Sequence, residues 1–218
     1  MKLLLTSGGL TNTSITKALF DLVGKKPEDT PLVFIPTAAN VEEGDKEWFI
    51  NDLVNLQKQG FKQIEIADIS AIPREIWEPR LKQADVIFFE GGNTYHLMEW
   101  IEKSGLKDLL PELLKTRVYV GVSAGSAITN PTLALKLSQV IYGEDIERTE
   151  DMDGLNYVPF YFLPHLNSEY FVNLREDKIK EAIVGIKEKV YAMDDNGALK
   201  VVDGKVEVIS EGEYLEFN

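Results

Sequence analysis

The chain contains no cysteine among its 218 residues, and it has only two histidines, His96 and His165. Without cysteine it can form no disulfide, thiolate metal site or cysteine nucleophile. Two histidines and no His-Glu-x-x-His pattern provide none of the usual zinc arrangements. The turn at Gly8-Gly9 lacks the Gly-x-Gly-x-x-Gly spacing of a dinucleotide site. We therefore expect neither a metal ion nor a cofactor.

The chain also has a shortage of positive charge and of long apolar runs. Its formal net charge is −13 and its pI is about 4.7, so it repels polyanions, and we expect no nucleic-acid partner. No apolar run approaches the roughly 20 residues that span a bilayer. The run Leu3-Leu4-Leu5 is followed at once by Thr6, so it is too short for a signal-peptide core. These absences predict a cytoplasmic protein with no membrane partner.

The length and the hydrophobic pattern predict one domain over residues 1–218, with an α/β fold. Strand-like and helix-like segments alternate, which indicates a three-layer, mostly parallel, doubly wound sheet with helices on both faces. The final turns, Asp195-Asn196-Gly197 and Asp203-Gly204, suit hairpins. The expected strands are residues 2–6, 32–35, 64–67, 86–89, 118–122, 158–163, 190–193, 198–202 and 206–209.

The most informative motif is Gly121-Val122-Ser123-Ala124-Gly125. A β-branched run enters it and small residues typical of a tightly packed helix start leave it, which is the strand–turn–helix context of a nucleophile elbow. The glycines allow close backbone approach, while the serine holds a strained conformation that exposes its hydroxyl. Ser123 is therefore the candidate nucleophile. The amide of Ala124 lies at a helix N-terminus, where a developing oxyanion is stabilised.

Ser123 needs a general base, and the two histidines are the candidates. His165 follows the strand 158–163 directly, and ligands of open α/β sheets bind at the carboxyl ends of the strands. His96 lies inside the helix after the Gly91-Gly92 turn, where a surface or capping role is expected. We therefore predict His165 as the base. Gly91-Gly92 permits close approach of the backbone, so the amide of Gly92 can serve as a second oxyanion donor.

Taken in order, these segments resemble the peptidase E family of serine dipeptidases. The resemblance covers nearly the whole chain. It rests on Phe34-Ile-Pro-Thr-Ala38, Gly91-Gly-Asn-Thr94, Gly121-Val-Ser-Ala-Gly125, Asp153-x-Leu155, Pro159-Phe160, Pro164-His165 and Arg175-Glu-Asp-Lys-Ile179. It implies a flavodoxin-like sheet, shared with class I glutamine amidotransferases. An amidotransferase is itself excluded, because its nucleophile is a cysteine.

The resemblance also implies roles for individual residues. Ser123 would be the nucleophile, His165 the base and then the acid, and the amides of Gly92 and Ala124 the oxyanion hole. Characterised members cleave dipeptides with an N-terminal aspartate, and Arg175 matches an arginine that would bind the aspartate side chain. A guanidinium pairs bidentately with a carboxylate, which suits that role. A solvated arginine at a helix start is the alternative.

The chain departs from the family pattern in two places. The usual third catalytic residue is an aspartate, at a position that here reads Leu137-Ser138-Gln139. Our hypothesis is a relocated acid from the loop before the histidine strand, with Glu144, Asp145, Glu147 and Asp153 as candidates; Ser138 is the non-carboxylate alternative. Glu90 stands where relatives often have a third glycine, which adds a carboxylate near the site.

Three functions remain open at this point. The first is a cytoplasmic serine peptidase acting on short peptides through an acyl-enzyme. The second is a small esterase, although only 42 positions separate Ser123 from His165 and no His-Gly-Gly-Gly motif precedes the elbow. The third is a catalytically weak relative that binds a metabolite or a protein, which the missing aspartate favours. The sequence leaves the oligomeric state open.

Overall fold

The computed structural model describes residues 1–143 and 147–218. Its main sheet has seven strands in the order β11-β10-β1-β5-β4-β2-β3. The strands from β1 to β3 in that order run parallel, and the hairpin β10–β11 adds antiparallel strands at the β1 edge. The strands are β1 (Lys2–Thr6), β2 (Pro31–Ile35), β3 (Gln63–Ile66), β4 (Val86–Phe89), β5 (Val118–Val122), β10 (Gly197–Val202) and β11 (Lys205–Ser210).

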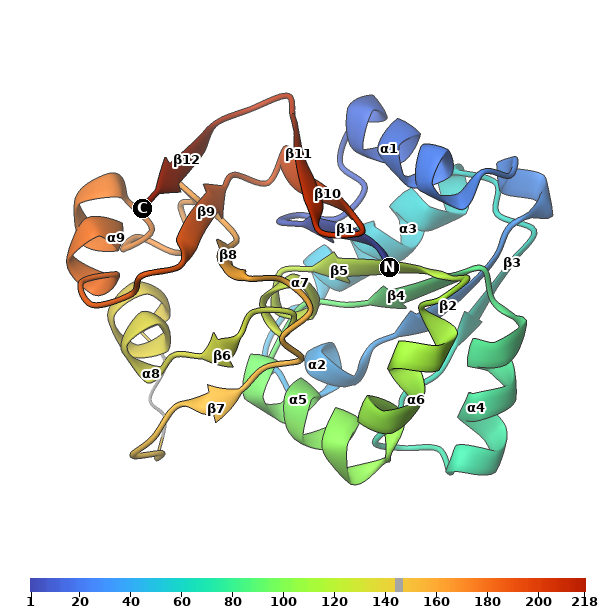
Figure 1. Cartoon of the computed structure of the whole chain (residues 1–218). Helices are drawn as coiled ribbons and strands as arrows, with labels where there is room; N and C mark the ends of the chain where they lie inside the picture. The colour runs from blue at the N-terminus through green and yellow to red at the C-terminus, as the bar shows by residue number, and fades with distance from the viewer. Residues whose placement is uncertain (144–146) are drawn as a thin grey trace.

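Helices cover both faces of this sheet (Figure 1). On one face lie α1 (Thr13–Val23) and α3 (Glu47–Lys58), whose Leu19 and Leu56 pack with apolar strand residues. On the other face lie α4 (Arg74–Gln83), α5 (Thr94–Lys103) and α6 (Leu106–Leu113), which bury Trp77, Ile101 and Leu110 in a second cluster. The helix α1 is capped at its N-terminus by Asn12, whose side chain accepts a hydrogen bond from the amide of Ile15. This arrangement confirms the predicted three-layer α/β fold.

A second sheet lies beside the main one, at the left of Figure 1. It has the order β12-β9-β8, with β8 (Phe160–Leu163) parallel to β9 (Lys189–Met193) and β12 (Tyr214–Phe217) antiparallel to β9. The helix α9 (Glu176–Ala182) and the turn η2 (Ser138–Tyr142), which follows α8 (Leu135–Leu137), pack on it around Leu163 and Ile179. Because 160–163 and 189–193 pair here, they do not extend the main sheet.

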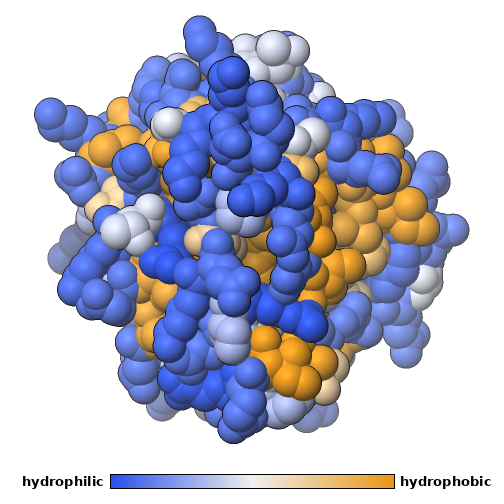
Figure 2. Space-filling view, turned by 90° about the vertical axis from the view of Figure 1, so that its right-hand side faces the viewer, coloured by the Kyte–Doolittle hydropathy of each residue, from blue (hydrophilic) through white to orange (hydrophobic). Residues whose placement is uncertain are grey.

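Short elements complete the chain: η1 (Pro27–Asp29), α2 (Thr37–Asn40), α7 (Ala124–Ala127) and the pair β6 (Thr132–Leu133) and β7 (Met152–Asp153). Within the described residues, no helix combines the length and apolar character needed to cross a membrane. Figure 2 views the molecule from the β3 side, where hydrophilic residues surround apolar ones. The exposed apolar side chains of α3, β3 and α4 include Ile50, Ile66 and Ile76.

Candidate active site

Ser123 occupies a strained turn between β5 and α7. Its φ of 47° and ψ of −107° lie outside the regions that a serine ordinarily adopts. The flanking glycines make the turn possible: a Cβ at Gly125 would lie 2.2 Å from the carbonyl oxygen of Phe89, and one at Gly121 would lie 2.5 Å from the Gly125 backbone. The amide of Ser123 donates to the carbonyl of Thr6 at 3.1 Å, which ties the turn to β1. Ser123 therefore occupies a tight, strained turn between a strand and a short helix.

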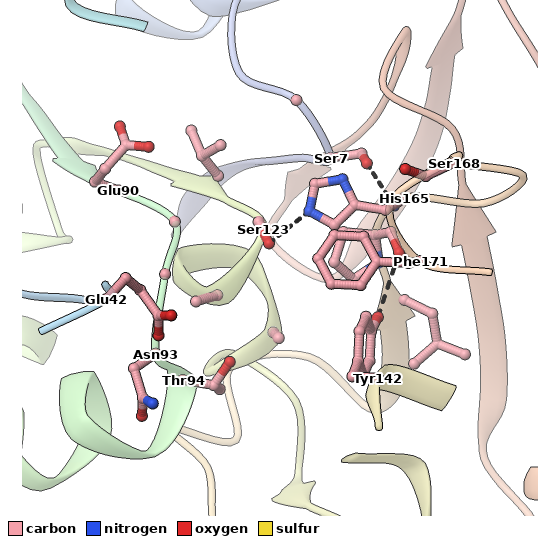
Figure 3. Close-up of a pocket in the computed structure, with 18 of the residues that line it drawn as sticks. Ser7, Glu42, Glu90, Asn93, Thr94, Ser123, Tyr142, His165, Ser168 and Phe171 are labelled. Atoms are coloured by element: carbon pink, nitrogen blue, oxygen red, sulfur yellow. Dashed lines mark hydrogen bonds between the residues drawn. The ribbon is translucent and has the colours of Figure 1, made fainter. Parts of the chain in front are cut away.

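His165 meets Ser123 from the end of β8. Its Nε2 lies 2.8 Å from Ser123 Oγ (Figure 3). The ring stacks on Phe171, with centroids 4.8 Å apart and planes 15° apart, and the His165 amide donates to Ser7 Oγ at 2.7 Å. The residue has a φ of 69°, a left-handed conformation that turns the chain at the strand end. Packing and hydrogen bonding therefore fix the imidazole against the serine.

The other ring nitrogen of His165 contacts Asp195. Its Nδ1 lies 2.6 Å from Asp195 Oδ1, in the turn between β9 and β10. Partial burial raises the pKa of Asp195, but hydrogen bonds from His165 and Ser7 and the positive charge of a protonated His165 outweigh it and hold that pKa below its usual value. An ionised Asp195 accepts the Nδ1 hydrogen, which leaves Nε2 free to accept a proton from Ser123.

This geometry corrects our hypothesis about the third acid. The carboxylate that contacts His165 belongs to the turn that the sequence identified only as a hairpin, and not to the loop before β8. Of the four candidates, Glu144 and Asp145 lie outside the described residues, while the partner at His165 Nδ1 is neither Glu147 nor Asp153. Ser138, the non-carboxylate alternative, lies 3.1 Å from the hydroxyl of Tyr95.

The turn after β4 lies against the serine. A Cβ at Gly91 would lie 3.3 Å from Ser123 Cβ, so only a glycine allows this close approach without displacement. Gly92 has a φ of 124°, and a Cβ there would lie 2.4 Å from the Ala38 carbonyl oxygen. The amide of Ala124 belongs to the first turn of α7, where amides have no intrahelical acceptor. The two predicted oxyanion donors thus lie on the segments that border Ser123.

The hydrogen bonds of the other two candidate residues are made with groups other than Ser123. His96 lies in α5, where its amide is capped by Asn93 Oδ1 at 2.9 Å, so His165 alone of the two histidines bonds to Ser123. Arg175 precedes α9, and its guanidinium donates to the carbonyl oxygens of Ser168 and Leu174, each at 3.0 Å. It holds the loop 168–174 and does not line the cavity over Ser123. The guanidinium is thus engaged by backbone carbonyls, and binding of a substrate by Arg175 stays a prediction.

A cavity of about 1320 Å³ opens over Ser123 and His165. Such a volume is above the range of roughly 300–1,000 Å³ typical of small-molecule sites. Figure 3 shows lining residues on two sides of the serine: Glu42, Glu90 and Asn93 on one side, and His165, Phe171 and Tyr142 on the other. A ligand that spans the cavity can therefore contact groups on both sides of the hydroxyl.

Two carboxyl groups are buried at the edge of this cavity. Glu90, at the end of β4, has no exposed surface, and Asp52 of α3 is 9% exposed. Burial raises the pKa of Glu90 well above its usual value, and the neighbouring Asp52 carboxyl raises it further, while the Gly91 amide opposes both. Burial likewise raises the pKa of Asp52, to about 6. Sequence reasoning identified Glu90 as a departure but missed Asp52, which looks like an ordinary polar residue of a surface helix.

Among the described residues, no group of three or more histidine, cysteine, aspartate and glutamate side chains has an arrangement that could hold a metal ion. The groups at Ser123 are instead suited to proton transfer, because a hydroxyl, an imidazole and a carboxylate are in hydrogen-bond contact. Such a chain can deprotonate the hydroxyl for attack on an electrophilic carbonyl carbon.

Comparison with solved structures supports the fold. The structure matches, with a TM-score of 0.78 and 24% identity, the crystal structure of a Listeria monocytogenes protein provisionally assigned to peptidase E, over 97% of this chain and 98% of that one. It also matches a peptidase from an acI-B1 actinobacterium with a TM-score of 0.66 and 18% identity, over 99% and 93% of the two chains.

Comparison with sequences adds the family. An uncharacterized peptidase of Listeria monocytogenes is 30% identical over 185 residues, which is 83% of this chain and 85% of that protein. Peptidase E of Shewanella oneidensis is 36% identical over 112 residues, covering 46% and 42% of the two chains. The profile of Peptidase family S51 matches residues 3–209, nearly the full length. The chain therefore belongs to peptidase family S51.

Proposed function

We propose that this protein is a serine peptidase that hydrolyses short peptides through an acyl-enzyme. The observation that carries the proposal is the continuous hydrogen-bonded chain from Ser123 Oγ through the His165 ring to Asp195 Oδ1, with distances of 2.8 and 2.6 Å. Membership of a peptidase family supports the same reaction class. The missing aspartate favoured a catalytically weak binding protein, and Asp195 removes that argument.

In the first half of the reaction, His165 Nε2 takes the proton of Ser123 while Oγ attacks the peptide carbonyl carbon. The carbonyl oxygen becomes an oxyanion, and the amides of Gly92 and Ala124 donate hydrogen bonds to it. The protonated His165 then donates its proton to the leaving nitrogen, the peptide bond breaks, and the amine product departs. The ionised Asp195 stabilises the imidazolium throughout and keeps its orientation.

In the second half, water replaces the amine. His165 takes a proton from the water as its oxygen attacks the ester carbon of the acyl-enzyme. Collapse of the second oxyanion releases the acid product, and His165 returns its proton to Ser123 Oγ. Each half uses the same base and the same oxyanion donors, so the enzyme ends in its starting state.

The expected substrates are dipeptides and other short peptides, since the cavity places groups on both sides of Ser123. The family resemblance implies dipeptides with an N-terminal aspartate. Such a side chain needs a cationic partner, and Arg175, which does not line the cavity, is bound to loop carbonyls. We therefore treat aspartyl dipeptides as one class to test, alongside neutral and basic ones.

The test is a dipeptide-library screen of the wild type and of Ser123→Ala. Ser138→Ala is a matched control, because Ser138 also lines the cavity but its hydroxyl contacts Tyr95. We expect Ser123→Ala to lower hydrolysis by on the order of 10³-fold or more with the fold unchanged, and the control to retain most of the activity. An alanine variant at position 123 that retains most of its activity would overturn the proposal.

A further inference from the structure

The charges that line the cavity are unevenly distributed. One side carries six carboxyl groups, which we call the acidic wall: Glu42, Glu43, Asp45, Glu47, Asp52 and Glu90. Three come from the α2–α3 connection, two from α3 and one from the end of β4. Of the residues that the structure describes, Arg148 is the one lysine or arginine that lines the cavity. It pairs with Glu99 at 2.5 Å and lies over the ring of Tyr95.

No lysine or arginine among the described residues forms an ion pair with the two carboxyl groups at the base of the acidic wall. Glu90 is fully buried, and within the described part of the chain neither of its carboxyl oxygens accepts a hydrogen bond. Its neighbour Asp52 is a second acid, and no ion pair among the described residues joins either group to a lysine or arginine. Buried carboxylates are usually paired with a cation or a donor. Without a cation, the pair retains a proton, which Glu90 donates in a hydrogen bond to the Asp52 carboxylate.

We propose that the acidic wall, with Asp52 and Glu90 at its base, binds a positively charged group of the substrate and makes this protein selective for peptides with a basic residue. The inference rests on the proposed peptidase function and assigns its substrate class. A lysine ammonium or arginine guanidinium supplies hydrogen-bond donors together with a positive charge, and so allows these carboxyl groups to ionise. An aspartate side chain in the same place is repelled by the wall.

The position of the wall makes it a determinant of specificity. Glu90 is one residue before Gly91, whose hypothetical Cβ lies 3.3 Å from Ser123 Cβ, so the wall begins beside the reacting hydroxyl. The side chain of Asp52 reaches the β1–α1 turn, where its Oδ1 lies 2.9 Å from a hypothetical Cβ at Gly9. A residue next to the scissile bond can therefore contact the wall. The net charge of −13 also favours the approach of cationic peptides.

Matched peptide pairs isolate the charge from the size of the side chain. Lys-Leu is compared with Met-Leu, Leu-Lys with Leu-Met, and Asp-Leu with Asn-Leu, because the members of each pair have similar length. We expect kcat/KM to be at least about fivefold higher for the lysine peptide in one of the first two pairs, and higher for Asn-Leu than for Asp-Leu. Equal rates for both lysine pairs, or a preference for Asp-Leu, would overturn the proposal.

Direct binding separates this proposal from the proposed function. Calorimetry with the Ser123→Ala protein measures the affinity for Lys-Leu, Leu-Lys, Met-Leu and Asp-Leu without turnover. Tighter binding of a lysine peptide than of Met-Leu and Asp-Leu supports the acidic wall even if the wild type cleaves none of them. In that case only the peptidase proposal fails. Tightest binding of Asp-Leu or of Met-Leu contradicts the acidic wall even in an active peptidase.

Charge-removing variants locate the effect. Glu90→Gln and Asp52→Asn keep the shape of the side chains, and we expect each to reduce the lysine preference at least about threefold while the rate for the neutral peptide changes less. Asp21→Asn is the control, because Asp21 is an exposed acid of α1 that does not line the cavity. A lysine preference that Glu90→Gln and Asp52→Asn both leave at the wild-type value would assign it to another part of the cavity and overturn the proposal.

Discussion

The Ser7 hydroxyl donates a 2.7 Å hydrogen bond to Asp195 Oδ1, the same oxygen that contacts His165 Nδ1. Ser7 Oγ also accepts the amide hydrogen of His165 at 2.7 Å. One hydroxyl at the end of β1 therefore holds both the backbone of the predicted base and the carboxylate that orients it. Such supporting contacts stabilise a reactive geometry without touching the substrate.

Replacing Ser7 tests this positioning role. We expect Ser7→Ala to lower kcat by about 10-fold to 100-fold with a smaller change in KM, because the Asp195 carboxylate loses a donor and His165 loses an acceptor for its amide. Steady-state kinetics on the best dipeptide gives both constants. Ser7→Thr retains the hydroxyl and is expected to recover part of the rate; no recovery would indicate that the loss is merely structural.

Asp195→Asn tests the third member of the catalytic chain. An amide of the same shape can donate to Nδ1 and so favours the wrong tautomer of His165, for which we expect a loss in kcat of on the order of 10³-fold to 10⁴-fold. Glu147→Gln and Asp153→Asn, at the positions first considered for this role, should remain close to the wild type. A strong loss in either of them, with Asp195→Asn active, would reverse the assignment.

Gly92→Ala tests the close approach of the turn after β4. An alanine there would have to adopt a φ of 124°, and its Cβ would lie 2.4 Å from the Ala38 carbonyl oxygen. We therefore expect the free energy of unfolding to fall by about 2–4 kcal/mol and the activity to be lost. The control is Gly24→Ala, whose φ is 73° but whose Cβ meets no atom within 4 Å. Its free energy of unfolding should fall only by the cost of placing an alanine in a left-handed backbone conformation, about 1–2 kcal/mol. Equal losses in urea unfolding of the two variants would contradict this interpretation.

The buried carboxyl pair has a consequence for stability as a function of pH. Burial raises the pKa of Asp52 to about 6 and the pKa of Glu90 well above its usual value, so the folded state holds protons more tightly than the unfolded chain does. The contribution of these groups to the free energy of unfolding is therefore greatest below the pKa values that they have in the unfolded chain, near pH 4. It falls as the pH rises through the pKa values that they have in the folded protein.

Glu90→Gln removes one of the two carboxyl groups and so reduces the loss of stability at high pH. We expect its melting temperature to exceed that of the wild type by roughly 2–4 °C or more at pH 8, which corresponds to about 1 kcal/mol for a chain of this length, and by less at pH 4. Thermal unfolding at the two pH values measures the difference. Asp21→Asn should show no such pH-dependent gain in melting temperature. A gain for Glu90→Gln that is larger at pH 4 than at pH 8 would contradict the expected direction of the pH dependence.

The sequence predicted Ser123 and His165 because each carries a local signal. The elbow motif can be recognised from the glycines on either side of Ser123. The base can be chosen because the chain has only two histidines. Asp195 has no such signal in an Asp-Asn-Gly turn, and its role depends on a pairing between strands far apart in the chain. Leu163 lies opposite Ala192 in the parallel pair β8–β9, so the residues after these strands emerge side by side. Strand pairing, had it been known, would have placed Asp195 beside His165.

The main sheet was predicted because its strands alternate with helices in the chain. The second sheet was not predicted, because the apolar runs at 158–163 and 190–193 could belong to strands of the main sheet just as well as to strands of a separate sheet. The helix α4 was also missed: it contains Pro79 and buries chiefly Trp77 and Leu81, which leaves a weak apolar stripe in a charged segment. Tertiary packing rather than local sequence decides both elements.

The parallel pair β8–β9 belongs to the smaller sheet, whereas Ser123 belongs to the larger one. The 2.8 Å contact between Ser123 and His165 therefore bridges two separately hydrogen-bonded bodies of structure. The two sheets nevertheless share one apolar cluster, in which Phe162 and Met193 of the smaller sheet lie with Leu5 and Phe89 of the larger one. Because this common core and the Ser7 hydrogen bonds hold the imidazole and its carboxylate against the main sheet, we expect hydrolysis to be lost together with the fold, over the same range of temperature or denaturant concentration.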